Sequence, residues 1–396
     1  MTATIRAARR ADLSAIYDLL ESAFPEATRS LFVAQTENDS TFRLRHGRVA
    51  LVDGEVAAYV RIFARRMMVR GVPVAAGGIG SVTTAAAVRS GGLATALLRD
   101  AIEQMRREGM ALSFLFTGIP GFYERVGFRI VREPQFTASR AEILAAATTP
   151  QFDMRPLADA DAAQVARIYT RAVAGSTGAI ARTRRTNADA LHWLDESASF
   201  VACEPATGRV IGYLRSRCRA FGHQALEAET LPGYQAAVAE LLAAVARRPC
   251  ACGDVVVAQA PSDHQLATAL QTLPSTTDTT DVEHPMMVRV ISLSRLVEAL
   301  LPGLRARAAG HPGPDFRLRL ASPDGGGATI AARGRSVWLN HGRPDFSLDA
   351  TSTLEALLGQ RRASRAVRRR IDPAAARRLD ALLPAAPLHF WNTDRI

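Results

Sequence analysis

The stretch Val74–Val131 limits what this chain can fold into more than any other part of it. It begins with a strand-like run that three glycines interrupt, and glycines inside a strand predict a bulge or the close approach of a ligand. The loop 89–92 then opens a segment whose apolar residues recur with the 3.6-residue period of a helix, and Gly109 ends it as a left-handed cap. The stretch therefore predicts a strand, a glycine-rich loop, an amphipathic helix and a second strand.

The start of that helix is suited to binding an anion. The first turn of a helix presents backbone N–H groups that have no partner within the helix, and the helix dipole adds a partial positive charge. Glycines at positions 91 and 92 let the backbone approach such an anion closely. A bulge in the preceding strand frees backbone groups to pair with an extended ligand that carries amides. Together the two features predict a site for a pantetheine chain with a pyrophosphate.

Two motifs in this stretch resemble the GNAT acetyltransferases. Arg89-x-x-Gly92-x-Ala94 is similar to the acyl-CoA loop of that superfamily, and the FYERVGF segment at 122–128 recurs there after the second strand. The resemblance implies that acetyl-CoA is the cosubstrate. A dinucleotide-binding Rossmann fold fits less well, because no Gly-x-Gly-x-x-Gly follows the first strand.

The patterns of strands and helices divide the 396 residues into three expected domains. Residues 1–149 are expected to form the acetyltransferase domain. Residues 150–286 repeat its opening strand and helix but lack the loop motif, since Leu231-Pro232-Gly233-Tyr234 stands in its place. Residues 287–396 are expected to form a smaller α+β domain with a C-terminal tail.

This three-part arrangement resembles the Eis family (enhanced intracellular survival), whose third domain is similar to sterol carrier proteins. The predicted fold class is α/β (α+β), with two tandem GNAT-like domains followed by a sterol-carrier-like α+β domain. The resemblance covers the whole chain and is strongest between Gly78 and Phe128.

Tyr123 is the predicted general acid. A phenol is protonated at neutral pH and can hand its proton to a departing thiolate, and the tyrosine of the matching segment has this role in Eis-like enzymes. The alternative is a half-buried tyrosine that only packs. The resemblance also implies that the carboxylate of the last residue, here Ile396 rather than the usual Phe, acts as the base. An α-carboxyl normally titrates near about 3.5, so it accepts a proton at neutral pH only through burial or through water.

Two further sets of residues are predicted to contact the ligands. The set expected around acetyl-CoA consists of Val82, Thr83, Thr84, Arg89, Ser90, Gly91, Gly92, Ala94 and Thr95. The set expected around the acceptor consists of Phe24, Glu26, Trp391, Asp394 and Arg395. Arg395 stands where aminoglycoside-modifying members of the family carry an acid, which favours a smaller amine with its own carboxylate.

Charge and cysteine content exclude or disfavour several other classes of function. The formal net charge is +11 and no residue is Lys, which excludes a lysine Schiff base and a P-loop lysine. The arginines are spread along the chain without interleaved aromatics, which favours a solvated surface over nucleic-acid binding. The four cysteines lack the spacing of a zinc site or a disulfide scaffold and are expected to be reduced thiols in a cytoplasmic protein. The scattered histidines predict no metal, and no window is apolar enough for a membrane span.

These inferences predict an acetyl-CoA-dependent N-acetyltransferase that acts by direct transfer on a primary amine of a small molecule, such as an antibiotic or another metabolite. Two alternatives stay open: acetylation of a protein or peptide, and a non-catalytic protein that holds an apolar ligand beside a vestigial GNAT site. The expected partners are the small-molecule amine and further copies of the chain, because Eis-like proteins form hexamers. Neither nucleic acid nor a membrane is an expected partner.

Overall fold

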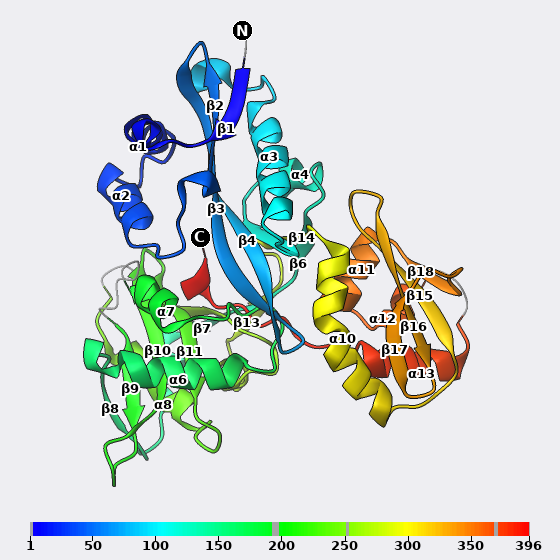
Figure 1. The fold of residues 1–396 in the computed structure, drawn as a ribbon. Coiled ribbons are helices and arrows are strands. Elements are labelled where there is room, and N and C mark those ends of the chain that lie inside the picture. Colours follow the sequence, from blue (N-terminus) through cyan, green and yellow to red (C-terminus); the bar gives the residue numbers. More distant parts are fainter. Residues whose placement is uncertain (1–2, 192–197, 251–252, 368–370, 396) are drawn as a thin grey trace. The chain divides into compact units, whose positions relative to one another are not determined.

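The computed structural model describes residues 3–191, 198–250, 253–367 and 371–395. By its internal contacts the chain divides into two compact units, which Figure 1 shows in ribbon form. Unit 1 comprises Met1–Val131 and His284–Ala386, and unit 2 comprises Arg132–Glu283 and Pro387–Arg395. Each unit contains strands and helices, so the predicted mixed α/β class is confirmed.

The centre of unit 1 is a seven-stranded sheet in the order β1-β2-β3-β4-β5-β14-β6. Its strands are β1 (Ala3–Ala7), β2 (Gly47–Val52), β3 (Glu55–Val69), β4 (Val72–Thr84), β5 (Leu112–Phe116), β14 (Met286–Val290) and β6 (Arg129–Val131). Neighbouring strands are antiparallel except β4 and β5, which are parallel.

Helices cover both faces of this sheet because its strands carry apolar side chains on both faces. Val60 and Ile62 pack with α3 on one face, whereas Val49 and Tyr59 pack with α1 and α2 on the other. Figure 1 shows α1 and α2 on one side of β2–β4 and α3 with α4 on the other. The helices are α1 (Leu13–Ala23), α2 (Arg29–Glu37), α3 (Leu93–Arg107) and α4 (Pro120–Glu124), and the 3-10 turns are η1 (Arg10–Asp12), η2 (Leu44–His46) and η3 (Ala86–Val88).

Unit 2 repeats this topology. Its seven strands run in the order β8-β9-β10-β11-β12-β7-β13, and β11 and β12 form its parallel pair. The strands are β8 (Asp153–Pro156), β9 (Phe200–Cys203), β10 (Val210–Arg219), β11 (Gly222–Thr230), β12 (Val255–Gln259), β7 (Gln135–Ser139) and β13 (Thr277–Thr279). The helices are α5 (Arg140–Ala145), α6 (Ala162–Val173), α7 (Arg184–Leu191), α8 (Ala237–Arg247) and α9 (Gln265–Gln271), with 3-10 turns η4 (Asp159–Asp161) and η5 (Asn392–Asp394).

In each sheet, the strand in the sixth position lies outside the run of sequence that forms the other six: β14 follows that run and β7 precedes it. The boundaries between the units therefore differ from the predicted domain boundaries. β7, expected in the first domain, lies in the sheet of unit 2, and β14, expected in the third, lies in the sheet of unit 1. The tail 387–395 also belongs to unit 2 rather than to a third domain. The alternation of side chains in a strand of five residues predicts the strand but not the sheet in which it pairs. The sequence therefore did not reveal that β7 lies in the sheet of unit 2 and β14 in the sheet of unit 1.

The rest of unit 1 is an α+β segment between residues 293 and 382. A four-stranded sheet in the order β17-β16-β15-β18 forms its centre. The elements are α10 (Leu293–Gly310), β15 (Phe316–Ala321), β16 (Gly327–Arg333), β17 (Ser336–Asn340), β18 (Phe346–Leu348), α11 (Ala350–Leu358), α12 (Ala363–Ala366) and α13 (Pro373–Leu382). The α+β character matches the expectation, and its likeness to sterol carrier proteins stays a prediction.

The expectation of reduced cysteines is wrong for one pair. Cys218 and Cys250 form a disulfide in unit 2, with Cα atoms 6.0 Å apart. The end of β10 and the segment after α8 meet there, which the sequence separation of 32 residues did not reveal. Cys203 is a buried free thiol, and Cys252 lies outside the described residues.

Candidate functional site

The predicted bulge lies in β4. Gly80 pairs with Arg61 and Thr83 pairs with Tyr59, so two residues of β4, Ser81 and Val82, stand opposite one residue of β3. Ser81 takes a positive φ of 54°, which a bulge of this kind accommodates. The bulge turns the end of β4 away from its regular course and interrupts the ladder at Val82.

Next to the bulge, β4 and β5 separate. Their parallel pairing covers only Ala76–Gly78 against Leu112–Phe114, although β4 continues to Thr84 and β5 to Phe116. From Ile79 onward the edge of β4 that faces β5 makes no strand pairing among the described residues. This opening leaves backbone groups available to an extended amide-bearing ligand.

The N-terminus of α3 follows at the end of β4. Gly92 caps the helix with a φ of 78°, a conformation that favours glycine, and Ala96 donates the first helical hydrogen bond to its carbonyl at 3.0 Å. The N–H groups of Leu93, Ala94 and Thr95 therefore point out of the helix end, where a pyrophosphate binds well. The Arg89 side chain donates to the carbonyl of Thr84 at 3.2 Å, which holds the loop against the strand.

Tyr123 lies beside this opening. Its ring is 7% exposed and makes edge contacts with Phe122 and Phe128, and it shares one apolar cluster with Leu115 of β5 and with Val82. Burial raises the pKa of the Tyr123 hydroxyl to about 12, so the phenol is protonated at neutral pH and remains a donor. The structure thus brings together the bulge, the helix end and the predicted acid in unit 1.

Two of the predicted acceptor residues, Phe24 and Glu26, lie on the opposite face of the same sheet. Phe24 follows the last residue of α1, lies with its ring centroid 6.1 Å from that of Phe32 in a tilted arrangement, and packs in the cluster of Tyr59. Glu26 is exposed in the turn that leads to α2.

The predicted tail residues lie in unit 2. Trp391 is fully buried, donates to Glu229 at 3.0 Å and packs edge-on against His264 and His389. Such a side chain anchors the tail and has no exposed surface with which to contact an acceptor. The other predicted residue with a clear role there, Asp394, pairs with Arg182 at 2.7 Å.

The sequence did not reveal a buried ionic cluster that holds the tail. Arg182, whose side chain is 2% exposed, binds Glu227 at 2.5 Å as well as Asp394. Thr393 contacts the Glu227 carboxylate, and the Tyr213 hydroxyl donates to it at 2.6 Å. Burial alone raises the pKa of Glu227, but the Arg182 guanidinium outweighs it and holds that pKa below its usual value. These partners lie up to 212 residues apart, so no local pattern marks them.

Arg395 faces a second buried acid of unit 2. Burial raises the pKa of Glu133 to about 8, an effect that Arg395 and a backbone hydrogen bond from Phe390 reduce. Arg395 therefore interacts with Glu133 inside unit 2. Ile396, the predicted base, lies outside the described residues.

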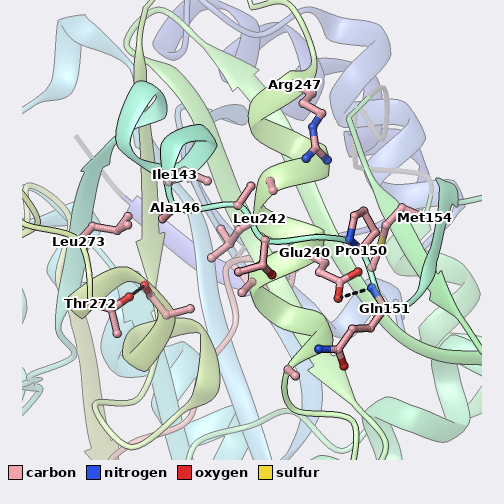
Figure 2. A pocket seen from close by; sticks show the side chains of 16 residues that line it. Ile143, Ala146, Pro150, Gln151, Met154, Glu240, Leu242, Arg247, Thr272 and Leu273 are labelled. Carbon is pink, nitrogen blue, oxygen red and sulfur yellow. Dashed lines mark hydrogen bonds between the residues drawn. The ribbon is translucent and has the colours of Figure 1, made fainter.

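A separate cavity of about 270 Å³ lies within unit 2, between α5, α8 and α9 (Figure 2). Its walls are mainly aliphatic, with Ile143, Leu242 and Leu273 among them. Glu240 accepts hydrogen bonds from the N–H groups of Gln151 and Phe152 at its edge. None of the predicted catalytic or cofactor residues lines it.

No group of three or more His, Cys, Asp or Glu side chains within them is arranged to hold a metal ion. No helix among them has the length and apolar character needed to cross a bilayer.

Comparison with known proteins agrees with this geometry. Residues 4–131 match the family model described as acetyltransferase (GNAT) domain. An uncharacterized N-acetyltransferase from Streptomyces avermitilis is 32% identical over 237 residues, which cover 55% of this chain and 56% of that relative. The chain therefore matches little more than half the length of this curated relative.

Two solved structures share the fold over their whole length. A GCN5-related N-acetyltransferase from Anabaena variabilis is 14% identical, with a TM-score of 0.77 and 100% of both chains covered. Eis1 from Mycobacterium abscessus is 18% identical, with a TM-score of 0.67 and the same coverage. The chain thus contains a GNAT acetyltransferase domain, and these two proteins share its fold.

Proposed function

We propose that this chain transfers the acetyl group of acetyl-CoA to the primary amine of a small molecule by direct attack. The observation that carries the proposal is the bulged, diverging end of β4 next to the glycine-capped N-terminus of α3, with Tyr123 beside both. The opening suits pantetheine, and the N–H groups of residues 93–95 suit the pyrophosphate.

The proposed reaction forms one bond, breaks one bond and moves two protons. The neutral amine forms a C–N bond with the thioester carbon, whose oxygen is polarised by backbone N–H groups near Val82. The C–S bond then breaks, and Tyr123 gives its proton to the leaving thiolate. The proton lost from the amine goes to a base, for which we propose the carboxylate of Ile396, directly or through water.

Substitution of the acid tests this assignment. Tyr123→Phe is expected to lower kcat about 100-fold while the KM for acetyl-CoA changes little, because the hydroxyl acts only as the thiolate leaves. A thiol-release assay with a panel of amines measures both constants. Tyr234→Phe is the matched control, since that hydroxyl binds Glu204 at the surface of unit 2. Unchanged turnover in Tyr123→Phe would remove Tyr123 as the acid.

For the acceptor we propose a small amine that carries its own carboxylate. The support for this choice is that position 395 lacks the acid that aminoglycoside-modifying members of the Eis family carry there, since a polycationic acceptor needs an anionic pocket and the charge of Arg395 itself faces Glu133. The purified enzyme should turn over an amino-acid-like amine faster than an aminoglycoside. A clear preference for the aminoglycoside, or for a peptide N-terminus, would overturn the choice without touching the acetyl transfer itself.

A second candidate function, binding of a small apolar ligand, is favoured by the aliphatic cavity in unit 2 (Figure 2). Calorimetry with acetyl-CoA separates the two candidates. A vestigial site should show no saturable binding of acetyl-CoA, whereas the proposed enzyme should bind it.

A further inference from the structure

A strongly basic cavity lies within unit 1, with a volume of about 830 Å³. Its walls come from α3, α4, β14 and the loop that follows β15. The lining includes five arginines, Arg99, Arg106, Arg125, Arg129 and Arg289, and two carboxylates, Glu124 and Asp324. Because a concave wall with an excess of one sign of charge concentrates counter-ions, the cavity attracts anions.

The buried arginine of the lining is Arg289, which is only 4% exposed. Its Nη2 binds Asp324 at 2.5 Å, while its Nε and Nη1 bond to no group among the described residues. Arg106 binds the other oxygen of Asp324 at 2.8 Å. Gly127 keeps this arrangement compact, because a Cβ there would lie 2.9 Å from Pro323 and 3.2 Å from the Arg289 Nη1.

Asp324 thus serves as an internal anion between two guanidinium groups. Its side chain is 45% exposed on a loop, so it can leave when a more highly charged group enters. Arg99 and Arg125 are exposed at the same wall and form no ion pair among the described residues. They are the free charges that such a ligand would meet first.

The cavity is distinct from the proposed pyrophosphate site. Arg99 and Arg106 follow the cap of α3, Gly92, by seven and fourteen residues, or about 10 Å and 21 Å along the helix axis. Arg289 pairs with Ser113 near the start of β5, whereas the opening between β4 and β5 begins beyond Phe114. Only one ribose separates the 3′-phosphate of coenzyme A from its pyrophosphate, which is too short a span to reach Arg106 and Arg289.

We propose that this cavity binds a phosphate-bearing anion other than the acyl-CoA cosubstrate, with the phosphate held by Arg106 and Arg289 in place of Asp324. Guanidinium groups bind phosphate oxygens through paired, charge-assisted hydrogen bonds, which a carboxylate of single charge matches less well than a phosphate dianion. A phosphomonoester or an inorganic phosphate fits this chemistry equally.

Titration calorimetry of the full chain with inorganic phosphate at pH 7.5 and low salt tests the proposal, since salt screens exposed charges. One saturable site is expected. Arg106→Gln should weaken binding about tenfold, because one charge-assisted contact is lost. Asp324→Asn should strengthen binding several-fold, because the internal competitor is neutralised. A general loss of folding cannot produce this second effect.

Asp345→Asn is the matched control. Asp345 is 44% exposed, pairs with Arg317 at 3.5 Å and changes the net charge by the same amount when substituted, but it lies outside the cavity. Equal effects of Asp324→Asn and Asp345→Asn would overturn the proposal, as would the absence of saturable binding. Saturating acetyl-CoA should leave the phosphate affinity unchanged. Competition would assign the site to the phosphates of coenzyme A and reject a separate ligand. These readouts require no turnover, so they are independent of the proposed acetyl transfer.

Discussion

The sheets of units 1 and 2 have the same strand order, the same parallel pair and the same kind of bulge, yet they differ in what occupies the opening beside that pair. In unit 2, Arg215 pairs with Glu227 and Ser216 with Ala225, so Leu226 is an extra residue in β11. The pairing of β11 with β12 ends at Ala225, and β11 continues to Thr230. The strand geometry alone therefore does not mark the cosubstrate site.

The difference lies in the loop and in the tail. In unit 1 the loop after β4 ends at Gly92, which caps α3 in the left-handed conformation, whereas in unit 2 the segment Leu231-Pro232-Gly233-Tyr234 leads to α8 with Ala236, in the right-handed conformation, as its cap. In unit 2 the tail residues His389 and Trp391 pack against Glu229 of β11 and against His264, which follows β12. The same type of sheet thus forms the proposed cosubstrate site in unit 1 and anchors the chain's own tail in unit 2.

The largest expected effect in this comparison comes from removing the anchor. Trp391→Ala should lower the free energy of unfolding by about 3–5 kcal/mol, because a fully buried indole leaves a cavity and its partner Glu229 loses a hydrogen bond. Urea denaturation followed by circular dichroism measures the loss. Trp338→Ala in β17 is the control, since that side chain is only half-buried and should cost less. Equal losses would contradict the anchoring role.

The second prediction compares two glycines of the same backbone type. Gly92 and Gly233 have φ values of 78° and 91°, and a Cβ at either position meets no atom within 4 Å. Gly92→Val should raise the KM for acetyl-CoA about tenfold or more, because the branched side chain distorts the loop and crowds the pyrophosphate position. Gly233→Val should cost comparable stability but leave that KM unchanged. If both variants shift KM alike, the loop of unit 1 has no special role.

Local sequence patterns predicted unit 1 well. The helix that the loop 89–92 opens, its left-handed end at Gly109 and the bulge in the preceding strand each follow from glycines and apolar spacing that lie close together in the chain. The local sequence around Gly233 likewise predicted that unit 2 has no comparable loop. Such features depend on backbone conformation and amphipathic periodicity, which neighbouring residues determine.

Long-range pairings in the fold could not be predicted in this way. The exchange of β7 and β14, the contact of Trp391 with Glu229 and the pairing of Arg182 with Asp394 join residues far apart in the sequence. A buried arginine has the same local pattern as an exposed one, and only tertiary packing distinguishes them. Because every cation of this chain is Arg, composition also concealed the basic cavity around Arg289.

A comparison of two pH values tests whether the tail of unit 2 is docked for stability alone. Glu133 lies against Phe390 and Arg395 of the tail, and burial raises its pKa from 4.5 to about 8. Between these pH values the folded chain holds a proton that the unfolded chain has released, so the free energy of unfolding contributed by Glu133 falls as pH rises through this window. Glu133→Gln keeps an acceptor for the Phe390 N–H and removes the titration.

This variant should therefore be more stable than the wild type by up to about 4 kcal/mol at pH 8, and by less than about 1 kcal/mol at pH 5. Urea midpoints at the two pH values measure the difference, with Glu103→Gln on the surface of α3 as the baseline. If acetyl transfer at saturating substrate is also unchanged in Glu133→Gln, the buried acid only limits stability. If turnover instead falls while the variant is more stable, Glu133 takes part in the reaction although it lowers the stability of the fold. The division between a unit 1 that binds ligands and a unit 2 that only anchors the tail would then be wrong.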